Sequence, residues 1–228
     1  MSRLLLFLCL LMGIARAELE PTVQLGGAIA TGKLDTVRQV LSSHPEAVNQ
    51  LDRRGHTPLQ LAIAARSDAA LVRLLLQMGA RPDLAGRSGM TPLASAIQLN
   101  QSGLCEVLLQ GGADPNLGGL QKLTPLHWAA MQADPAAGVQ LVNLLIRYRA
   151  NPNALDGDGS TPLHRVLQRA MQKDAQMAPL LEALIAGGAN PNQKMSFAES
   201  GVQVSPLEMA RKLNLTRCAE VLGRAGAR

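Results

Sequence analysis

The sequence predicts an all-α repeat solenoid of about six stacked helix-turn-helix units with turn or hairpin fingers. A Thr-Pro-Leu triplet begins at Thr57, Thr91, Thr124 and Thr161, and Ser205 begins a weaker copy. A Leu-rich segment follows each triplet, and each unit closes on a pair such as Gly79-Ala80 or Gly112-Ala113. A unit of about 33 residues with two short helices cannot bury its own apolar surface, so such units must stack.

The first 17 residues are expected to be a signal peptide that is removed. Arg3 precedes an apolar run from Leu4 to Ile14, and Ala15-Arg16-Ala17 matches a small-x-small cleavage site. A membrane-spanning helix needs about 20 apolar residues, so an uncleaved anchor is the weaker alternative. We therefore expect an exported protein, most simply a periplasmic one, although secretion is also compatible with this signal.

The remaining residues, 18–228, are expected to form one repeat domain. Each triplet should open a helix, because Thr can cap a helix start and Pro suits the first helical position. A small residue such as Ala62 lies five places after each Thr and lets that helix approach its neighbours. Gly79 and its counterparts should end the second helix in the left-handed conformation. The expected units lie near residues 21–53, 54–87, 88–120, 121–157, 158–201 and 202–228.

These motifs identify a resemblance to a known family. The segments TPLHWAA at 124–130, GGADPN at 111–116 and GGANPN at 187–192 resemble the signature of the ankyrin repeat. The resemblance implies a curved stack of helix pairs whose fingers project to one side and whose concave face binds proteins without catalysis. It also implies that His127 and His164 are structural partners of the Thr in their own units.

Four features depart from that pattern. Arg149 replaces a closing Gly, so we expect helix termination in the fourth unit to differ. Extra residues at 133–135 and 171–179 should lengthen helix ends or the loops between them. The longest insertion, between Asn192 and Ser205, carries Phe197, which either anchors a partner or folds back on the last helix pair.

Composition and spacing argue against catalysis and against bound metals or cofactors. The chain has 22 Lys and Arg against 17 Asp and Glu, and loss of Arg3 and Arg16 reduces the net charge from +5 to 20 − 17 = +3. That excess is too small to predict binding of nucleic acid or, after signal cleavage, of a membrane. Four scattered His residues show no metal-ligand spacing, and no nucleophile or phosphate-binding motif is present.

Two smaller clusters receive structural interpretations. Asp156 and Asp158 lack the remaining ligands of a calcium loop and are interpreted as a solvated turn. Cys105 and Cys218 lie on the apolar stripes of second helices three units apart, too far for a disulfide, and are expected to be buried.

The contact residues follow from the family positions on the fingers and on the exposed end of each first helix. Early fingers are basic and the middle of the face is apolar, a composition suited to a protein interface. The alternative is that the Leu and Met residues pack between neighbouring fingers. The predicted set is Arg53, Arg54, His56, Arg87, Met90, Leu99, Leu120, Leu123, Met131, Arg169 and Phe197.

The sequence hypothesis is a non-catalytic protein-binding module in the periplasm. Its resemblance to small exported bacterial ankyrin proteins implies either an accessory factor for catalase-dependent peroxide resistance or an immunity protein that neutralises a toxic enzyme. A secreted effector directed at a host is a further alternative, and the partner's identity stays open.

Overall fold

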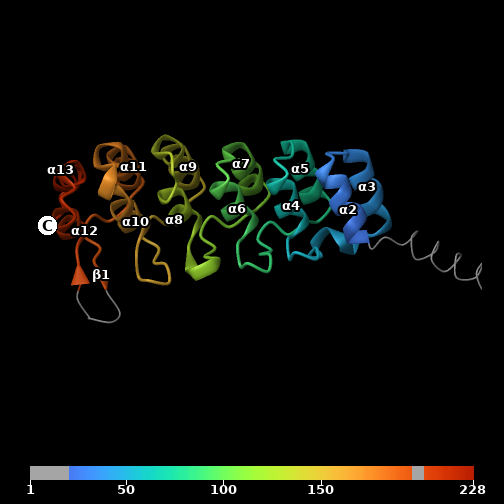
Figure 1. Ribbon diagram of the computed structural model, residues 1–228, viewed down its shortest axis with the longest axis horizontal. Helices are drawn as coiled ribbons and strands as arrows, with labels where there is room; N and C mark the ends of the chain where they lie inside the picture. Colours follow the sequence, from blue (N-terminus) through green and yellow to red (C-terminus); the bar gives the residue numbers. More distant parts are fainter. Residues whose placement is uncertain (1–20, 197–202) are drawn as a thin grey trace, which may run out of the picture.

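The computed structural model describes residues 21–196 and 203–228. In this part of the chain the helices form six pairs in a single row, with the fingers projecting from one side (Figure 1). The expected all-α repeat solenoid is confirmed. The expected signal peptide and Phe197 lie outside the described residues. No helix within the described ranges combines the length and the hydrophobicity needed to cross a membrane.

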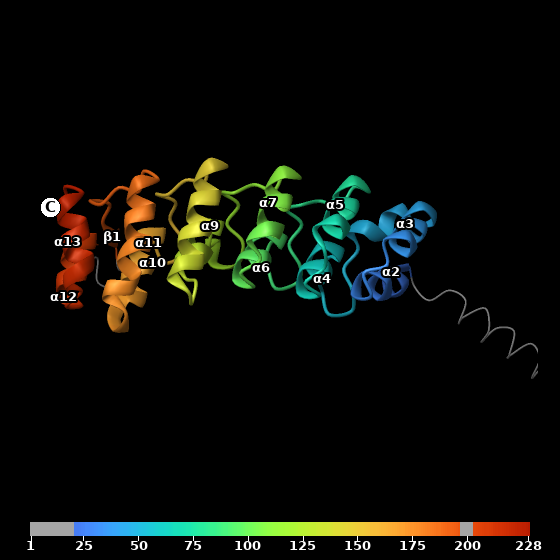
Figure 2. The same ribbon diagram turned by 90° about the horizontal axis from the view of Figure 1, so that it is seen from above.

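Two rows of helices make up the solenoid, as Figure 2 shows from above. The first helices of the six pairs are α2 (Pro21–Ala30), α4 (Pro58–Ala64), α6 (Pro92–Gln98), α8 (Pro125–Ala130), α10 (Pro162–Arg169) and α12 (Pro206–Lys212). The second helices are α3 (Leu34–Ser43), α5 (Ala69–Gln77), α7 (Ser102–Gln110), α9 (Pro135–Arg147), α11 (Asp174–Ala186) and α13 (Thr216–Arg224). Each helix contacts its pair partner and the corresponding helix of the next unit.

The repeated triplets open helices as predicted. From α4 onward, every first helix begins at the Pro of its triplet. The Thr57 hydroxyl accepts a hydrogen bond of 3.1 Å from the backbone N–H of Gln60, and Ser205 receives an equivalent bond of 3.2 Å from Glu208. These caps satisfy N–H groups that have no partner inside the helix.

From α5 onward the second helices end alike, including α9, for which we expected a difference. Gly79 has φ +93°, and Arg149 takes the same left-handed region at φ +65°. The N–H of Arg149 donates to Ile146 O at 2.9 Å and that of Ala150 to Leu145 O at 3.0 Å. Glycine-ended helices make the same pair of bonds. The prediction for Arg149 was wrong because these bonds outweigh the steric cost of a side chain at positive φ.

The core is a continuous apolar band between the two helix rows. The small residue of each first helix is fully buried, with 0% exposure at Ala62, Ala96 and Ala129. The matching Leu of each second helix, such as Leu75 and Leu108, is also at 0%. Small side chains bring the first helices close together, while Leu fills the space between pairs.

Side-chain amides at the base of the fingers join consecutive units. The Asn116 Oδ1 accepts from the N–H of Asn151 at 2.6 Å, and its Nδ2 donates to Arg149 O at 3.2 Å. Asn49, Asn153 and Asn192 make the same pair of bonds to the following unit. At Asp83 the carboxylate can only accept, and it does so from Asp114 N at 3.0 Å.

The extra residues of the fourth and fifth units lengthen helices, which is one of the two outcomes that we expected. Helices α9 and α11 each have 13 residues, whereas α5 and α7 have 9. The short 3-10 turns are Pro45–Asn49, Leu120–Lys122 and Ala170–Gln172. The last finger is a hairpin of β1 (Met195–Ser196) and β2 (Gln203–Val204), in which Met195 pairs with Val204. Both of these residues are buried.

The left-handed Arg149 gives a test of this account of helix termination. Arg149→Gly should raise the free energy of unfolding by about 0.5–1 kcal/mol, because glycine removes the strain but gains more freedom when unfolded. Urea denaturation measures the change. Gly79→Arg is the reciprocal control and should lower stability, whereas equal stability of all three proteins would contradict the strain.

Candidate protein-binding face

The fingers form one connected edge along the solenoid. They span residues 51–56, 85–90, 118–123 and 155–160 and project from the side of the first helices (Figure 1). The N–H of Arg87 donates to Gly55 O at 2.7 Å, and that of Gly157 donates to Gln121 O at 2.7 Å. We call the surface of these fingers and of the adjoining first helices the finger face. Its backbone is held by hydrogen bonds, so its side chains are presented at fixed spacing.

Most of the predicted contact residues reach solvent on this face. Arg53, Arg54, His56, Arg87 and Arg169 are exposed. Leu120 is also exposed, with 45% of its surface accessible.

The predicted residues Met90, Leu99 and Met131 are half-buried. Leu99 packs against the core, in agreement with the alternative that some apolar side chains fill the stack. Together with the exposed cations, the half-buried Met residues give the face a mixed basic and apolar character.

The prediction that Leu123 is a contact residue was wrong, because only 6% of its surface is exposed. It precedes the helix cap, and the residues at the same position of the fourth finger and of the β1–β2 hairpin, Ser160 and Val204, are buried as well. In these fingers the residue before the cap turns into the stack. Leu123 therefore leaves the predicted contact set.

Sequence reasoning missed further apolar residues near this face. Leu155 lies on the fourth finger with an exposure of 50%, and Leu117, exposed to 36%, immediately precedes the third. Trp128 lies on α8 directly after His127 and is half-buried against the core. The sequence did contain a signal for Trp128, because the residue after the motif His does not lie at one of the buried positions of its helix. No such signal marks Leu117 or Leu155.

The third of these fingers is conformationally strained. Gln121 and Lys122 both have positive φ, at +53° and +55°, where the other three fingers place a single glycine, namely Gly55, Gly89 or Gly159. A non-glycine residue in this region costs roughly 1–2 kcal/mol, and such strain is concentrated at recognition sites. Both side chains are exposed at the fingertip beside Leu120.

The two motif histidines are structural, as the resemblance implied. Thr124 N donates to His127 Nδ1 at 3.2 Å, so the ring proton lies on Nε2, which donates to Ser160 O at 2.9 Å. Gln60 does the same in its unit, accepting from Thr57 N and donating to Met90 O at 2.8 Å. Each side chain thereby ties its helix to the next finger.

His164 makes only the first of the two hydrogen bonds that the His127 ring makes. Its Nδ1 accepts from Thr161 N at 3.2 Å, but its buried Nε2 has no partner among the described residues. Burial lowers the pKa of His164 to about 4. Burial likewise lowers the pKa of His127, so both rings are neutral and neither is a proton donor accessible to a substrate.

The prediction of a solvated turn was wrong for Asp156, because its carboxylate is buried. Its Oδ1 accepts from the N–H groups of Asp158 and Ser160 at 2.9 and 3.0 Å. Its Oδ2 accepts from Arg165 Nε at 2.7 Å, and Arg165 also pairs with Asp158 at 2.6 Å. The last of the four fingers is thus internally neutralised, whereas the earlier three present Arg54, Arg87 and Lys122 to solvent.

The described residues offer no arrangement suited to catalysis at a metal or thiol. No group of three or more His, Cys, Asp or Glu within 21–196 and 203–228 could hold a metal ion. Cys105 on α7 and Cys218 on α13 are free and fully buried. Burial raises the pKa of Cys105 to about 12 and also raises that of Cys218, so both thiols stay protonated and unreactive.

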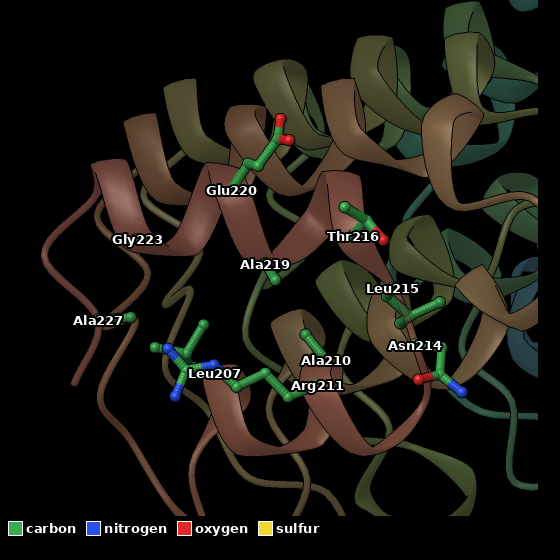
Figure 3. A pocket seen from close by; sticks show the side chains of 10 residues that line it. All are labelled: Leu207, Ala210, Arg211, Asn214, Leu215, Thr216, Ala219, Glu220, Gly223 and Ala227. Atoms are coloured by element: carbon green, nitrogen blue, oxygen red, sulfur yellow. The ribbon is translucent and has the colours of Figure 1, made fainter.

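Hollows occur at both ends of the solenoid. At the C-terminal end, a groove of about 560 Å³ lies between α12 and α13 (Figure 3). It exists because Arg211, Ala219 and Gly223 occupy positions that hold Leu167, Leu181 and Ile185 in the preceding unit. At the other end, a groove of about 370 Å³ is lined by residues of α2, α4 and the first finger, including Arg53 and Arg54.

Comparisons with known proteins agree with this architecture. A family model of ankyrin repeats in three copies matches residues 25–119, and one of many ankyrin copies matches residues 126–182. Over 91 residues the chain is 35% identical to the ankyrin repeat protein YahD of Escherichia coli (strain K12). That alignment covers 36% of this chain and 45% of YahD, so the chain spans less than half of that relative.

Two solved structures share the fold. The ankyrin repeat domain of Bcl-3, a member of the IkappaB family, superposes with a TM-score of 0.77 at 24% identity. The alignment covers 90% of this chain and 86% of that domain. An ankyrin repeat domain from Acinetobacter baumannii AYE gives a TM-score of 0.75 at 24% identity, covering 90% of this chain and 98% of that domain. At these identities the likeness concerns the fold alone.

The shared geometry of Gln60 and His127 predicts which substitutions the stack tolerates. His127→Gln should change the free energy of unfolding by less than about 1 kcal/mol, because glutamine can make both hydrogen bonds. His127→Leu should lower it by about 2–4 kcal/mol, because Thr124 N and Ser160 O then lose a buried partner. Urea denaturation of both variants checks this, and equal losses would contradict the interpretation.

The lowered pKa of His164 predicts a loss of stability in mild acid. Between pH 6.5 and about 4 the unfolded histidine binds a proton that the folded one does not. The free energy of unfolding should therefore fall as pH decreases through this window, by up to about 1.4 kcal/mol per pH unit. His164→Gln should flatten the slope measured by denaturation at several pH values, leaving the share of His127. An unchanged slope would refute the assignment to His164.

Proposed function

The chain belongs to the ankyrin-repeat family, and from this we propose that it is a non-catalytic module that holds another protein on its finger face. Ankyrin repeats generally act as scaffolds for protein interactions. The specific elements of the proposal are the face used, the export of the chain and the class of role that it serves.

The choice of face rests on a set of exposed side chains that have no structural role in the fold. Arg54, Arg87 and Lys122 are exposed on consecutive fingers, and no salt bridge among the described residues joins them to a carboxylate. Isolated surface cations are common, but Lys122 lies on the same finger as the exposed Leu120, and the finger that carries Arg87 approaches Leu120 at Gly89. Arginine beside accessible apolar side chains is the composition of protein interfaces.

The burial of reactive Cys and His side chains supports the proposal that the module is non-catalytic. Four of the nucleophilic and basic groups that the sequence offered, Cys105, Cys218, His127 and His164, are buried and neutral. A general base must reach a substrate proton directly or through one water. These groups serve packing and hydrogen bonding inside the stack instead.

Export to the periplasm is supported by the sequence of residues 1–17, with its short apolar run and Ala-Arg-Ala end. In that compartment we propose two alternative roles, namely an immunity protein for a cognate toxic enzyme and an accessory factor for catalase-dependent peroxide resistance. A host-directed secreted effector is a third, weaker alternative. A toxin inhibitor should block its target stoichiometrically, whereas loss of an accessory factor should sensitise cells to hydrogen peroxide.

The positive charge of the finger face restricts the kind of toxic enzyme that the chain could neutralise. A nuclease holds phosphates in a basic cleft, so a protein that plugs this cleft should itself be acidic. Three of the four fingers instead present exposed cations, namely Arg54, Arg87 and Lys122. If the chain neutralises an enzyme, we therefore propose a target with an acidic contact surface rather than a nuclease.

Charge reversal on the fingers tests the assigned face. Arg54→Glu combined with Arg87→Glu should reduce capture of the partner from a periplasmic extract by at least about tenfold, because opposite charges become like charges. Capture by the immobilised protein is quantified by mass spectrometry. The melting temperature should stay almost unchanged, since neither side chain is buried.

The matched control reverses two exposed arginines of the second-helix row, Arg38→Glu and Arg73→Glu, and so changes the net charge equally. This control should capture the partner normally. Capture that survives reversal of Arg54 and Arg87, or that is lost equally in the control, would refute the finger face as the binding surface.

A further inference from the structure

The groove at the N-terminal end of the finger face has an apolar floor. It is formed by Thr22, Val23 and Gly26 of α2, by Leu61 of α4 and by finger residues 51–54. Val23 and Leu51 leave 39% and 41% of their surfaces accessible. The volume of about 370 Å³ is at the lower end of the range of ligand pockets and suits one large apolar side chain with its neighbours.

The charges at the rim of this groove do not cancel. The carboxylate of Asp52 accepts from Arg54 N at 2.9 Å and from His56 N at 2.7 Å, and it lies 3.5 Å from His56 Nδ1. Although partial burial opposes the effect, these bonds lower the pKa of Asp52 below its usual value. Its negative charge is thus committed to the finger's own backbone, while the Arg54 side chain extends into solvent.

The next finger carries a second exposed cation close to the first finger. Arg87 donates its backbone N–H to Gly55 O at 2.7 Å. A Cβ built on Gly55 would collide with the Cβ of Arg87, so the two fingers are packed together at this point. Glycine at position 55 is what allows Arg87 to pack against the first finger, so the exposed Arg87 lies on the finger next to Arg54, which itself lines the groove.

We propose that this groove receives a large apolar side chain of the partner protein flanked by carboxylates. This inference rests on the proposed function and specifies the chemistry of the partner. The apolar floor binds the side chain, while Arg54 at the groove and Arg87 on the next finger pair with the adjacent acidic groups, each in a bidentate geometry available to guanidinium. The groove between α12 and α13 does not offer this combination, because Arg211 and Glu220 line it together (Figure 3).

A peptide probe tests the proposal without knowledge of the partner. The probe is a capped pentapeptide with one leucine flanked on each side by two glutamates, titrated into the full chain labelled with nitrogen-15. The expected result is saturable change of amide shifts at residues 22–26 and 51–61. Arg54→Glu and Leu51→Glu should each weaken binding by about tenfold, equivalent to about 1.4 kcal/mol.

A matched control is available in the fourth finger. Leu155 lies six residues before its cap, as Leu51 does, and is exposed to 50%. Leu155→Glu should leave binding of the probe unchanged. Thermal unfolding checks that each variant is folded, which the exposure of the substituted side chains favours.

Several results would overturn the proposal. These are equal binding of a probe with lysine in place of glutamate, equal binding of a probe with alanine in place of leucine, shifts confined to α12 and α13, or no binding. Concentration-dependent dimerisation that Leu51→Glu abolishes would instead assign the groove to a second copy of the chain. If the probe fails while reversal of Arg54 and Arg87 still abolishes partner capture, the groove assignment is wrong and the proposed function stands.

Discussion

The structure depends on one constraint, which is that no unit can bury its own apolar surface. A first helix such as α6, Pro92–Gln98, has too few residues to form a core with α7 alone. Its buried side, with Ala96 and Ile97 at 0% exposure, is completed by the neighbouring units. Stability is therefore shared along the row, and each layer of Ala and Leu residues supports the next.

Two series of polar contacts fix the register that apolar packing leaves free. Gln60 and His127 each reach a carbonyl oxygen of the next finger, and Asn116 with its counterparts bonds the end of the next second helix. Hydrophobic burial is non-directional, whereas a hydrogen bond defines a position to within a few tenths of an ångström. The Gln60 contact places the second finger relative to the first and the His127 contact places the fourth relative to the third, so the first of them sets the spacing of Arg54 and Arg87.

Sequence periodicity predicted those parts of the fold that each unit repeats. The Thr-Pro helix starts, the buried position of Ala62 and its equivalents, and the burial of Cys105 all follow from local rules applied at a known spacing. The errors fell where a side chain's environment depends on contacts that the repeat spacing does not encode. Arg149 keeps the standard helix end because its N–H donates to Ile146 O and that of Ala150 to Leu145 O, and the buried Asp156 carboxylate accepts from Arg165.

The candidate site was harder to predict for the same reason. Charge and family position sufficed for Arg53, Arg54 and Arg87, which are exposed in the folded chain. Leu123 and Leu155 are both apolar residues on fingers, and Leu117 immediately precedes one, yet only Leu123 is buried. Alternation along a finger does not reveal which residues turn inward, because the direction depends on the conformation of the fingertip. Gln121 and Lys122 at positive φ could not be foreseen from a segment without glycine.

That strained fingertip separates the requirements of stability from those of recognition. Glycine occupies the corresponding turn in three of the four fingers, at φ between +72° and +84°, and would relieve the strain at Lys122 as well. Lysine there costs conformational energy and adds no packing, since its side chain is exposed. What it adds is a cation beside Leu120 in the middle of the finger face. A fold whose layers share their stability can carry such a cost at one finger, because the helices on either side are held by contacts that the fingertip does not make.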